Sequence, residues 1–255
     1  MLTAPEITRL LFIDVETASG HPAFAEVPEL EQKHWYRKAA RLLRKDAAEE
    51  LSAEEAAQSY TNSAAIFAEY GRVVCISCGY VRFEDNGTLP KYHIKSFYGT
   101  DEAALLQAFV ELLRQNLGDL QYRWQTLCGH NIKEFDVPYL ARRCVVNGIL
   151  PLPFGLDIAG RKPWEIPHLD TMEQWKFGDY KAYTALELLA SILDVPTPKA
   201  DIDGSQVSGL FWESGELDRI AAYCERDVAA TMSVLLRMNG LPIASPDAIS
   251  YSVNP

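Results

Sequence analysis

The chain has 255 residues, a net charge of −11, 48% hydrophobic residues and 23% charged residues. Such a chain is long enough for one sizeable core, and its composition is ordinary for a soluble globular protein. The acidic balance argues against a protein that coats nucleic acid through a generally positive surface, but it allows one that grips a phosphate chain locally. The apolar run at Leu10 is too short to span a membrane or to act as a signal peptide, so we expect a cytoplasmic protein.

The first half of the chain predicts three strands and two helical segments. Aliphatic and β-branched runs predict strands at about 8–14, 72–83 and 91–99, and an Asn-Gly pair at Asn86 and Gly87 predicts a hairpin between the last two. Residues from about 28 to 57 are rich in Ala, Leu, Glu, Lys and Arg, which predicts helix. The amphipathic run at 101–117 predicts a further helix with Asp101 at its start.

The second half alternates strands with helices. Short strands are expected at 124–131 and just before Leu169, and helices at 135–148, 182–194 and 215–238. This order predicts an α/β protein with a mixed central sheet, helices on both faces, and a helical insertion between the first and second strands. We expect one domain over residues 1–240, with the insertion at about 20–65 on one edge. Residues 241–255 look like a tail with little regular structure.

The five cysteines do not predict a disulfide framework, because their number is odd. Cys75 and Cys78 could suggest a zinc or redox site. On a strand, however, residues three apart point to opposite faces, and the chain has no second cysteine pair to complete a tetrahedral site. A structural role for these cysteines is therefore the stronger interpretation.

Three short stretches carry acidic residues in positions that suggest chemistry. Asp14 and Glu16 are two apart, so on a strand they share a face at its C-terminal end, where sites of α/β proteins are usually built. Each stretch also has a plain alternative. Asp14 and Glu16 could be a solvated strand end, and Asp136 could be an ordinary helix N-cap. Tyr223 and Asp227 share one helical face, but could be a core aromatic beside a surface acid.

Taken together, the three stretches resemble the motifs of the DEDD superfamily of 3′→5′ exonucleases, which have a ribonuclease H-like fold. "FIDVET" resembles the first motif through Asp14 and Glu16. "GHNIKEFDVPYL" resembles the second through Asn131, Phe135 and Asp136. "YCERD" resembles the third motif in its tyrosine form, through Tyr223 and Asp227, since Ala222 occupies the position of the histidine of the other subclass. The resemblance covers roughly Thr8 to Met238. It is closest to the predicted exonucleases related to the proofreading domain of family B DNA polymerases.

The resemblance implies a hydrolase that removes nucleotides from the 3′ end of single-stranded nucleic acid, with DNA favoured over RNA. Asp14 would bridge two divalent ions, and Glu16, Asp136 and Asp227 would complete the two sites. Carboxylate oxygens suit Mg²⁺ or Mn²⁺, and two ions roughly 4 Å apart can bind both the attacking and the leaving oxygen of a phosphodiester. Tyr223 would orient the attacking water, because a neutral phenol is a poor base at neutral pH.

The family pattern further suggests residues that hold the 3′ end of the substrate. Thr17 could offer its backbone N–H to the terminal hydroxyl, while His130 and Phe135 could hold the terminal base; Phe135 could equally be plain core. Asn131 either fixes its turn or touches the substrate. Asp170 precedes a predicted helix, and a capping or supporting role is favoured over direct metal ligation. The chain departs from many relatives at Ala18, where a Gly is common in the first motif.

A basic stretch, "KHWYRKAARLLRK" from Lys33 to Lys45, leaves two interpretations open. It could be a solvated helix face, or a positive flank that guides single-stranded nucleic acid, with Trp35 and Tyr36 as stacking surfaces. Two other functions also remain open: a binding module that has lost catalysis, and a metal-dependent phosphatase or nucleotidase. A proofreading role would need a separate polymerase or repair partner.

Overall fold

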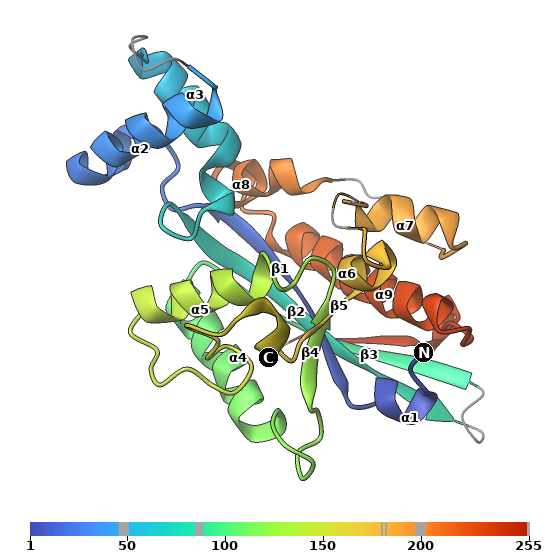
Figure 1. Cartoon of the computed structure of the whole chain (residues 1–255). Helices are drawn as coiled ribbons and strands as arrows, with labels where there is room; N and C mark the ends of the chain where they lie inside the picture. Colours follow the sequence, from blue (N-terminus) through green and yellow to red (C-terminus); the bar gives the residue numbers. More distant parts are fainter. Residues whose placement is uncertain (46–50, 85–88, 180, 182, 197–201, 254–255) are drawn as a thin grey trace.

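The protein is described by a computed structural model that covers residues 1–45, 51–84, 89–179, 181, 183–196 and 202–253. The expected Asn86–Gly87 turn lies outside these ranges. Within them, six strands form one sheet in the order β5-β4-β1-β2-β3-β6 (Figure 1). The strands are β1 (Leu10–Ser19), β2 (Gly71–Glu84), β3 (Leu89–Tyr98), β4 (Thr126–Gly129), β5 (Leu169–Asp170) and β6 (Ile249–Val253).

The sheet is mixed, as the order of elements along the chain predicts. β1, β2 and β3 form an antiparallel meander. β4 runs parallel to β1 and β5 parallel to β4, and β6 is added in parallel beside β3. The α/β architecture and the helical insertion after the first strand are therefore confirmed.

Helices cover both faces of this sheet (Figure 1). Successive side chains of β1 point to opposite faces, so the strand contributes apolar residues to the packing on each side. On one face, Leu11, Ile13 and Val15 pack in a core cluster with α4 (Glu102–Asn116) and α5 (Asp136–Val146). On the other face, Leu10 and Phe12 pack with α9 (Leu217–Met238). The shorter helices α1, α6, α7 and α8 span Ala4–Ile7, Thr171–Lys176, Leu186–Ile192 and Val207–Gly209.

The insertion forms a helical arm, which we define as α2, α3 and their connections between β1 and β2; it projects from the body in Figure 1. In place of one helical segment, the structure has α2 (Glu29–Leu42) and α3 (Ala53–Ser63). α3 begins where Ser52 and Glu55 form a reciprocal capping box. Trp35 is fully buried in the arm's own core against Tyr60, so it is not available as a stacking surface as the sequence suggested.

Two further expectations are corrected. β1 continues to Ser19, so Asp14 and Glu16 lie within the strand and not at its end. The expected C-terminal tail contains β6, which pairs in parallel with the edge of β3. So short a strand forms only where another strand offers a free edge for pairing. The sequence alone does not show that the edge of β3 is free. In the described ranges, no helix is both long and apolar enough to cross a membrane.

Candidate metal centre

The site begins where β4 ends. β4 pairs with β1 only as far as Phe12, so that edge of β1 is unpaired from Ile13 onward. The freed backbone N–H of Val15 donates instead to Oδ1 of Asp136 at 3.1 Å, which brings the start of α5 to the edge of the strand. Asp136 comes from the face of the sheet that α4 and α5 cover, whereas the side chain of Asp14 belongs to the opposite face. The hydrogen bond at the strand edge brings the two residues side by side.

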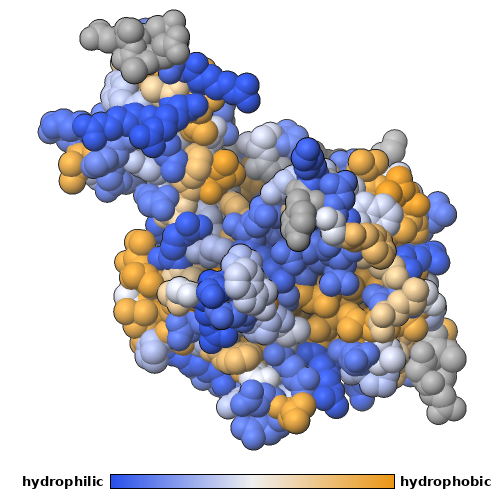
Figure 2. Space-filling model, viewed as in Figure 1, coloured by the Kyte–Doolittle hydropathy of each residue, from blue (hydrophilic) through white to orange (hydrophobic). Residues whose placement is uncertain are grey.

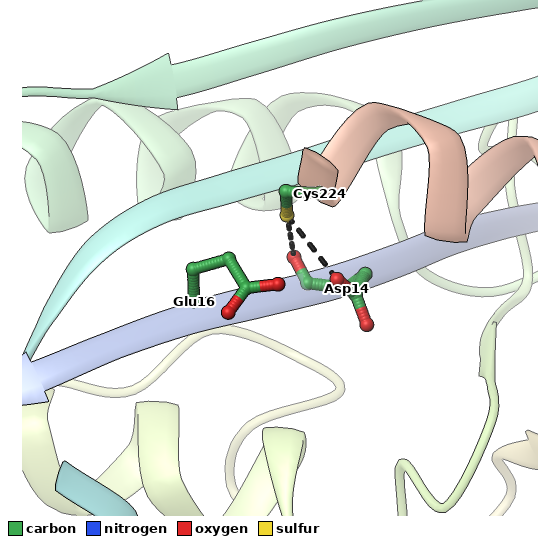
Figure 3. A group of neighbouring side chains, drawn as sticks. All are labelled: Asp14, Glu16 and Cys224. Carbon is green, nitrogen blue, oxygen red and sulfur yellow. Dashed lines mark hydrogen bonds between the residues drawn. The ribbon is translucent and has the colours of Figure 1, made fainter. Parts of the chain in front are cut away.

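Asp14 and Glu16 point the same way, as their spacing on a strand predicts (Figure 3). One carboxylate oxygen from each and the Sγ of Cys224 all lie within 4.8 Å of one another. The Cys224 thiol donates to the backbone oxygen and to Oδ2 of Asp14, both at 3.3 Å. Cys224 is on α9, so the helix that covers this face is held directly against the acidic part of β1 (Figure 3).

α9 also contributes Tyr223 and Asp227, which lie about one turn apart on it. The Tyr223 hydroxyl lies near enough to the Asp227 carboxylate for each group to shift the pKa of the other. The structure thus brings together all five residues that the three motifs single out, from β1, α5 and α9.

The four carboxyl groups have raised pKa values, and burial is the largest cause for each. For Asp14, the nearby charges of Asp227, Glu16 and Asp136 add to the effect of burial and raise the pKa well above its ordinary value. Glu16 is raised in the same direction by burial and by Asp227. Burial raises the pKa of Asp136 to about 7 and that of Asp227 to about 6. Ionising all four groups without a compensating positive charge is therefore costly.

The two neutral donors of the site stay protonated. Burial, together with the charges of Asp227, Glu16 and Asp14, raises the pKa of Tyr223 above its usual value. Burial also raises the pKa of the Cys224 thiol well above its usual range. Both groups consequently stay neutral and do not add further negative charge to the site.

Asp170 takes the capping role that the sequence favoured. Its carboxylate accepts hydrogen bonds from the backbone N–H groups of Met172 and Glu173 at the start of α6. It also accepts from the N–H groups of Asn131 (3.0 Å) and Lys133 (3.2 Å). One buried carboxylate therefore fixes both the N-terminus of α6 and the turn that precedes Asp136.

The four residues expected to hold a substrate are found around this turn and the adjoining strand. Thr17 is buried next to an irregularity in the β1–β2 pairing, and its side chain contacts the Tyr139 hydroxyl. Asn131 adopts a left-handed conformation (φ 61°), and its buried Oδ1 has no partner within the described residues. Phe135 is half-buried and stacks at a tilt on Tyr139, with ring centroids 5.3 Å apart.

His130 is used internally in this structure. Nε2 lies 2.9 Å from the carbonyl oxygen of Thr184 and therefore donates to it, while Nδ1 lies 2.9 Å from the Thr171 hydroxyl. Burial lowers the pKa of His130, which keeps the ring neutral. With both nitrogens bonded to the protein, His130 fixes the segment before α7, and neither nitrogen remains for a substrate.

The sequence interpretation overlooked Cys224, although it lies next to Tyr223 in "YCERD". The available signal was helical geometry: a residue adjacent to Tyr223 and three before Asp227 lies near the same face of α9. What no local pattern indicates is that this thiol contacts Asp14, which is 210 residues away along the chain.

A comparison with family models places this geometry in a known context. Residues 66–243 match the model of a predicted 3′-5′ exonuclease related to the exonuclease domain of PolB. The matched region contains Asp136, Tyr223 and Asp227, whereas Asp14 and Glu16 precede it. No curated protein matches the chain. Because the match spans more than half of the chain, the protein belongs to this family of predicted 3′-5′ exonucleases related to the exonuclease domain of PolB.

Proposed function

We propose that this protein is a two-metal-dependent 3′→5′ exonuclease that hydrolyses single-stranded nucleic acid, with DNA preferred. The observation that carries the proposal is the convergence of Asp14, Glu16, Asp136 and Asp227, from three separate elements, at one largely buried position. Four carboxylates with raised pKa values are unfavourable together unless cations occupy the space between them. A protein that only binds nucleic acid has no need of such an arrangement.

The donor set fits hard divalent cations such as Mg²⁺ or Mn²⁺, because its ligand atoms are carboxylate oxygens. The Cys224 thiol is protonated and donates to Asp14, so it is not counted among the ligands. Asp14 would be shared between two ions, and Glu16, Asp136 and Asp227 would complete the coordination. When bound, the ions supply positive charge that stabilises the attacking and leaving oxygens of the phosphodiester.

The protein's own residues would hold and orient the reactants. The Tyr223 hydroxyl would direct its O–H toward Asp227, so its oxygen would be left free to accept a hydrogen bond from the attacking water. Because the pKa of Tyr223 is raised, the phenol stays neutral and orients this water without removing its proton. The Cys224 thiol, donating to Asp14, would fix the orientation of that carboxylate.

Three residues near the acids would hold the 3′ end. The backbone N–H of Thr17 would donate to the terminal hydroxyl, and the half-buried Phe135 ring would stack against the terminal base. The unpartnered Oδ1 of Asn131 would accept a hydrogen bond from the substrate, since a buried acceptor without a partner is otherwise costly.

The proposal is tested with purified protein, Mn²⁺ or Mg²⁺, and oligonucleotides labelled at the 5′ end, as DNA and RNA of the same sequence. We expect a descending ladder of labelled products from DNA, a weaker one from RNA, and none in EDTA. The Asp14→Ala variant, checked for folding by circular dichroism, should give no ladder.

The same assay distinguishes the alternatives. Release of phosphate from small phosphomonoesters without degradation of the oligonucleotides would indicate a phosphatase or nucleotidase. Tight binding of the oligonucleotide with no product under either metal would indicate a binding module that has lost catalysis.

A further inference from the structure

The exposed side of the helical arm carries basic residues that are not part of the acidic site. Arg37 and Arg41 are four residues apart on α2, and Arg44 follows just beyond the end of the helix. All three are exposed, whereas the buried residues Trp35 and Ala39 occupy the other side of α2. We call Arg37, Arg41 and Arg44 the arginine row; hydrophilic residues cover this part of the arm in Figure 2.

The other basic residues of the same stretch already have partners. Lys33 pairs with Glu29 at 2.9 Å and Lys45 with Glu55 at 2.7 Å. Lys38 lies over the ring of Phe67, with Nζ 3.5 Å from its centroid. No described residue forms an ion pair with a member of the arginine row.

The arginine row thus places three cations without an ion-pair partner among the described residues in one short stretch of a chain whose net charge is −11. Like charges four residues apart on a helix repel and weaken it slightly. An external polyanion would remove this cost.

The arm is held firmly to the body, so it presents the row at a fixed position. Its aromatic core includes Trp35, whose Nε1 donates to the carbonyl of Ala56 at 3.0 Å. At its return to β2, two side chains of α5 hold its backbone. Tyr139 donates to the carbonyl of Ala65 (2.8 Å) and Arg143 to that of Ala68 (2.9 Å). Binding to such a preorganised surface costs little ordering entropy.

The base of the arm adjoins the acidic site through two elements. β1 carries Glu16 and ends at Ser19, where the connection to α2 begins. α5, which anchors the return of the arm, starts at Asp136. A strand whose 3′ end lies at the carboxylates can therefore continue toward the arm.

We infer that the arginine row binds the phosphates of the substrate strand upstream of the 3′ end that is cleaved; this rests on the function proposed above. Arginine suits this role because its planar guanidinium binds phosphate through two parallel hydrogen bonds and is always charged. Four residues advance a helix by about 6 Å, so Arg37 and Arg41 can contact separate phosphates. The arm thus supplies affinity for a long strand and none for a mononucleotide.

The test compares two triple variants that remove the same charge. In R37Q/R41Q/R44Q the row is neutral, and Gln keeps the helix propensity close to that of Arg. The control, R9Q/R82Q/K91Q, neutralises cations at the opposite end of the β1–β2 pair. Both variants change the net charge from −11 to −14, since each loses three positive charges.

Binding of fluorescent single-stranded DNA is measured in EDTA by anisotropy over a range of salt concentrations. Each phosphate contact contributes about 0.7 to the slope of log affinity against log salt for a single strand. We expect the row variant to lose about two units of slope and at least tenfold in affinity at low salt. The control should keep the slope of the unmodified protein.

A small substrate separates this inference from the proposed function. The p-nitrophenyl ester of thymidine 5′-phosphate has no upstream phosphates, so the row variant should hydrolyse it, with Mn²⁺, as fast as the unmodified protein. If the unmodified protein fails to degrade this ester and the oligonucleotides alike, the proposed function is wrong. The inference is overturned if the unmodified protein degrades these substrates but the row variant keeps the full salt slope. It is also overturned if the control variant loses as much slope as the row variant. An acidic protein surface then becomes the candidate partner of the arginine row.

Discussion

At the residue scale, Tyr223 differs from the acids around it, because it contributes a neutral hydroxyl beside Asp227. We predict that Tyr223→Phe lowers kcat about 10- to 100-fold but leaves measurable activity, since it removes an orienting hydrogen bond and no charge. Asp14→Ala and Asp227→Ala should abolish activity. Single-turnover hydrolysis of an oligonucleotide by each variant gives the comparison, and equal loss in all three folded variants would contradict this ranking.

Asp170 is a residue whose effect on the site would be indirect. Its carboxylate accepts four backbone hydrogen bonds, two from the turn before Asp136 and two from the start of α6. Asp170→Ala leaves these buried donors unsatisfied, and we expect it to lower the free energy of unfolding by about 2–4 kcal/mol. Urea denaturation measures the loss. Asp170→Asn keeps one acceptor oxygen and should therefore recover part of the lost stability. If Asp170→Asn recovers neither stability nor activity, the capping role is contradicted.

At the scale of elements, a buried ion pair joins α4, α5, β2 and the return of the arm. Glu102 is buried, accepts from Arg143 Nε at 2.8 Å, and also accepts from the backbone N–H of Val73 at 2.7 Å. Arg143 in turn donates to the carbonyl of Ala68. This pair closes the base of the arm against α5.

We predict that Arg143→Met lowers the free energy of unfolding by about 3–5 kcal/mol, because it leaves the Glu102 charge buried and unpaired. Hydrogen exchange should also rise in the return of the arm, where Ala68 loses its donor. The double variant Arg143→Met, Glu102→Gln removes the unpaired charge and should be more stable than the single variant. A single variant as stable as the unmodified protein would show that the pair does not fix the arm.

At the scale of the whole molecule, the acidic site couples stability to pH and to metal. The folded protein retains protons on Asp136 (pKa about 7) and Asp227 (about 6) that the unfolded chain releases near pH 4. The free energy of unfolding of the metal-free protein should therefore fall as pH rises from about 4 to about 7. Asp14 and Glu16, whose pKa values are also raised, act in the same direction. His168, whose pKa burial lowers to about 4, acts in the opposite direction below about pH 6.5.

Thermal unfolding in EDTA between pH 5 and 8 measures this dependence, and Asp136→Asn isolates one contribution because it cannot ionise. We expect the variant to lose less stability than the unmodified protein as pH rises. Added Mg²⁺ or Mn²⁺ should raise the melting temperature of the unmodified protein more at pH 8 than at pH 5.5, since ionised carboxylates bind cations. The same shift at both pH values would be evidence against a carboxylate metal site.

The sequence by itself determined the α/β class, most of the helices and strands, and which acids to examine. These features are local: strand and helix periodicity, caps, and the spacing of Asp14 with Glu16 and of Tyr223 with Asp227 are visible within one or two turns of chain. Element boundaries were less certain, as the extension of β1 to Ser19 and the division of the insertion into α2 and α3 show.

Only the tertiary structure decided which of these pieces meet. Asp136 lies beside Asp14 because β4 stops early and leaves the N–H of Val15 free, which depends on how far two distant strands pair. Cys224 contacts Asp14, Trp35 is buried in the arm, and β6 adds to β3, each through partners far along the chain. Such contacts depend on packing and on free hydrogen-bonding edges, which arise only once the elements are assembled.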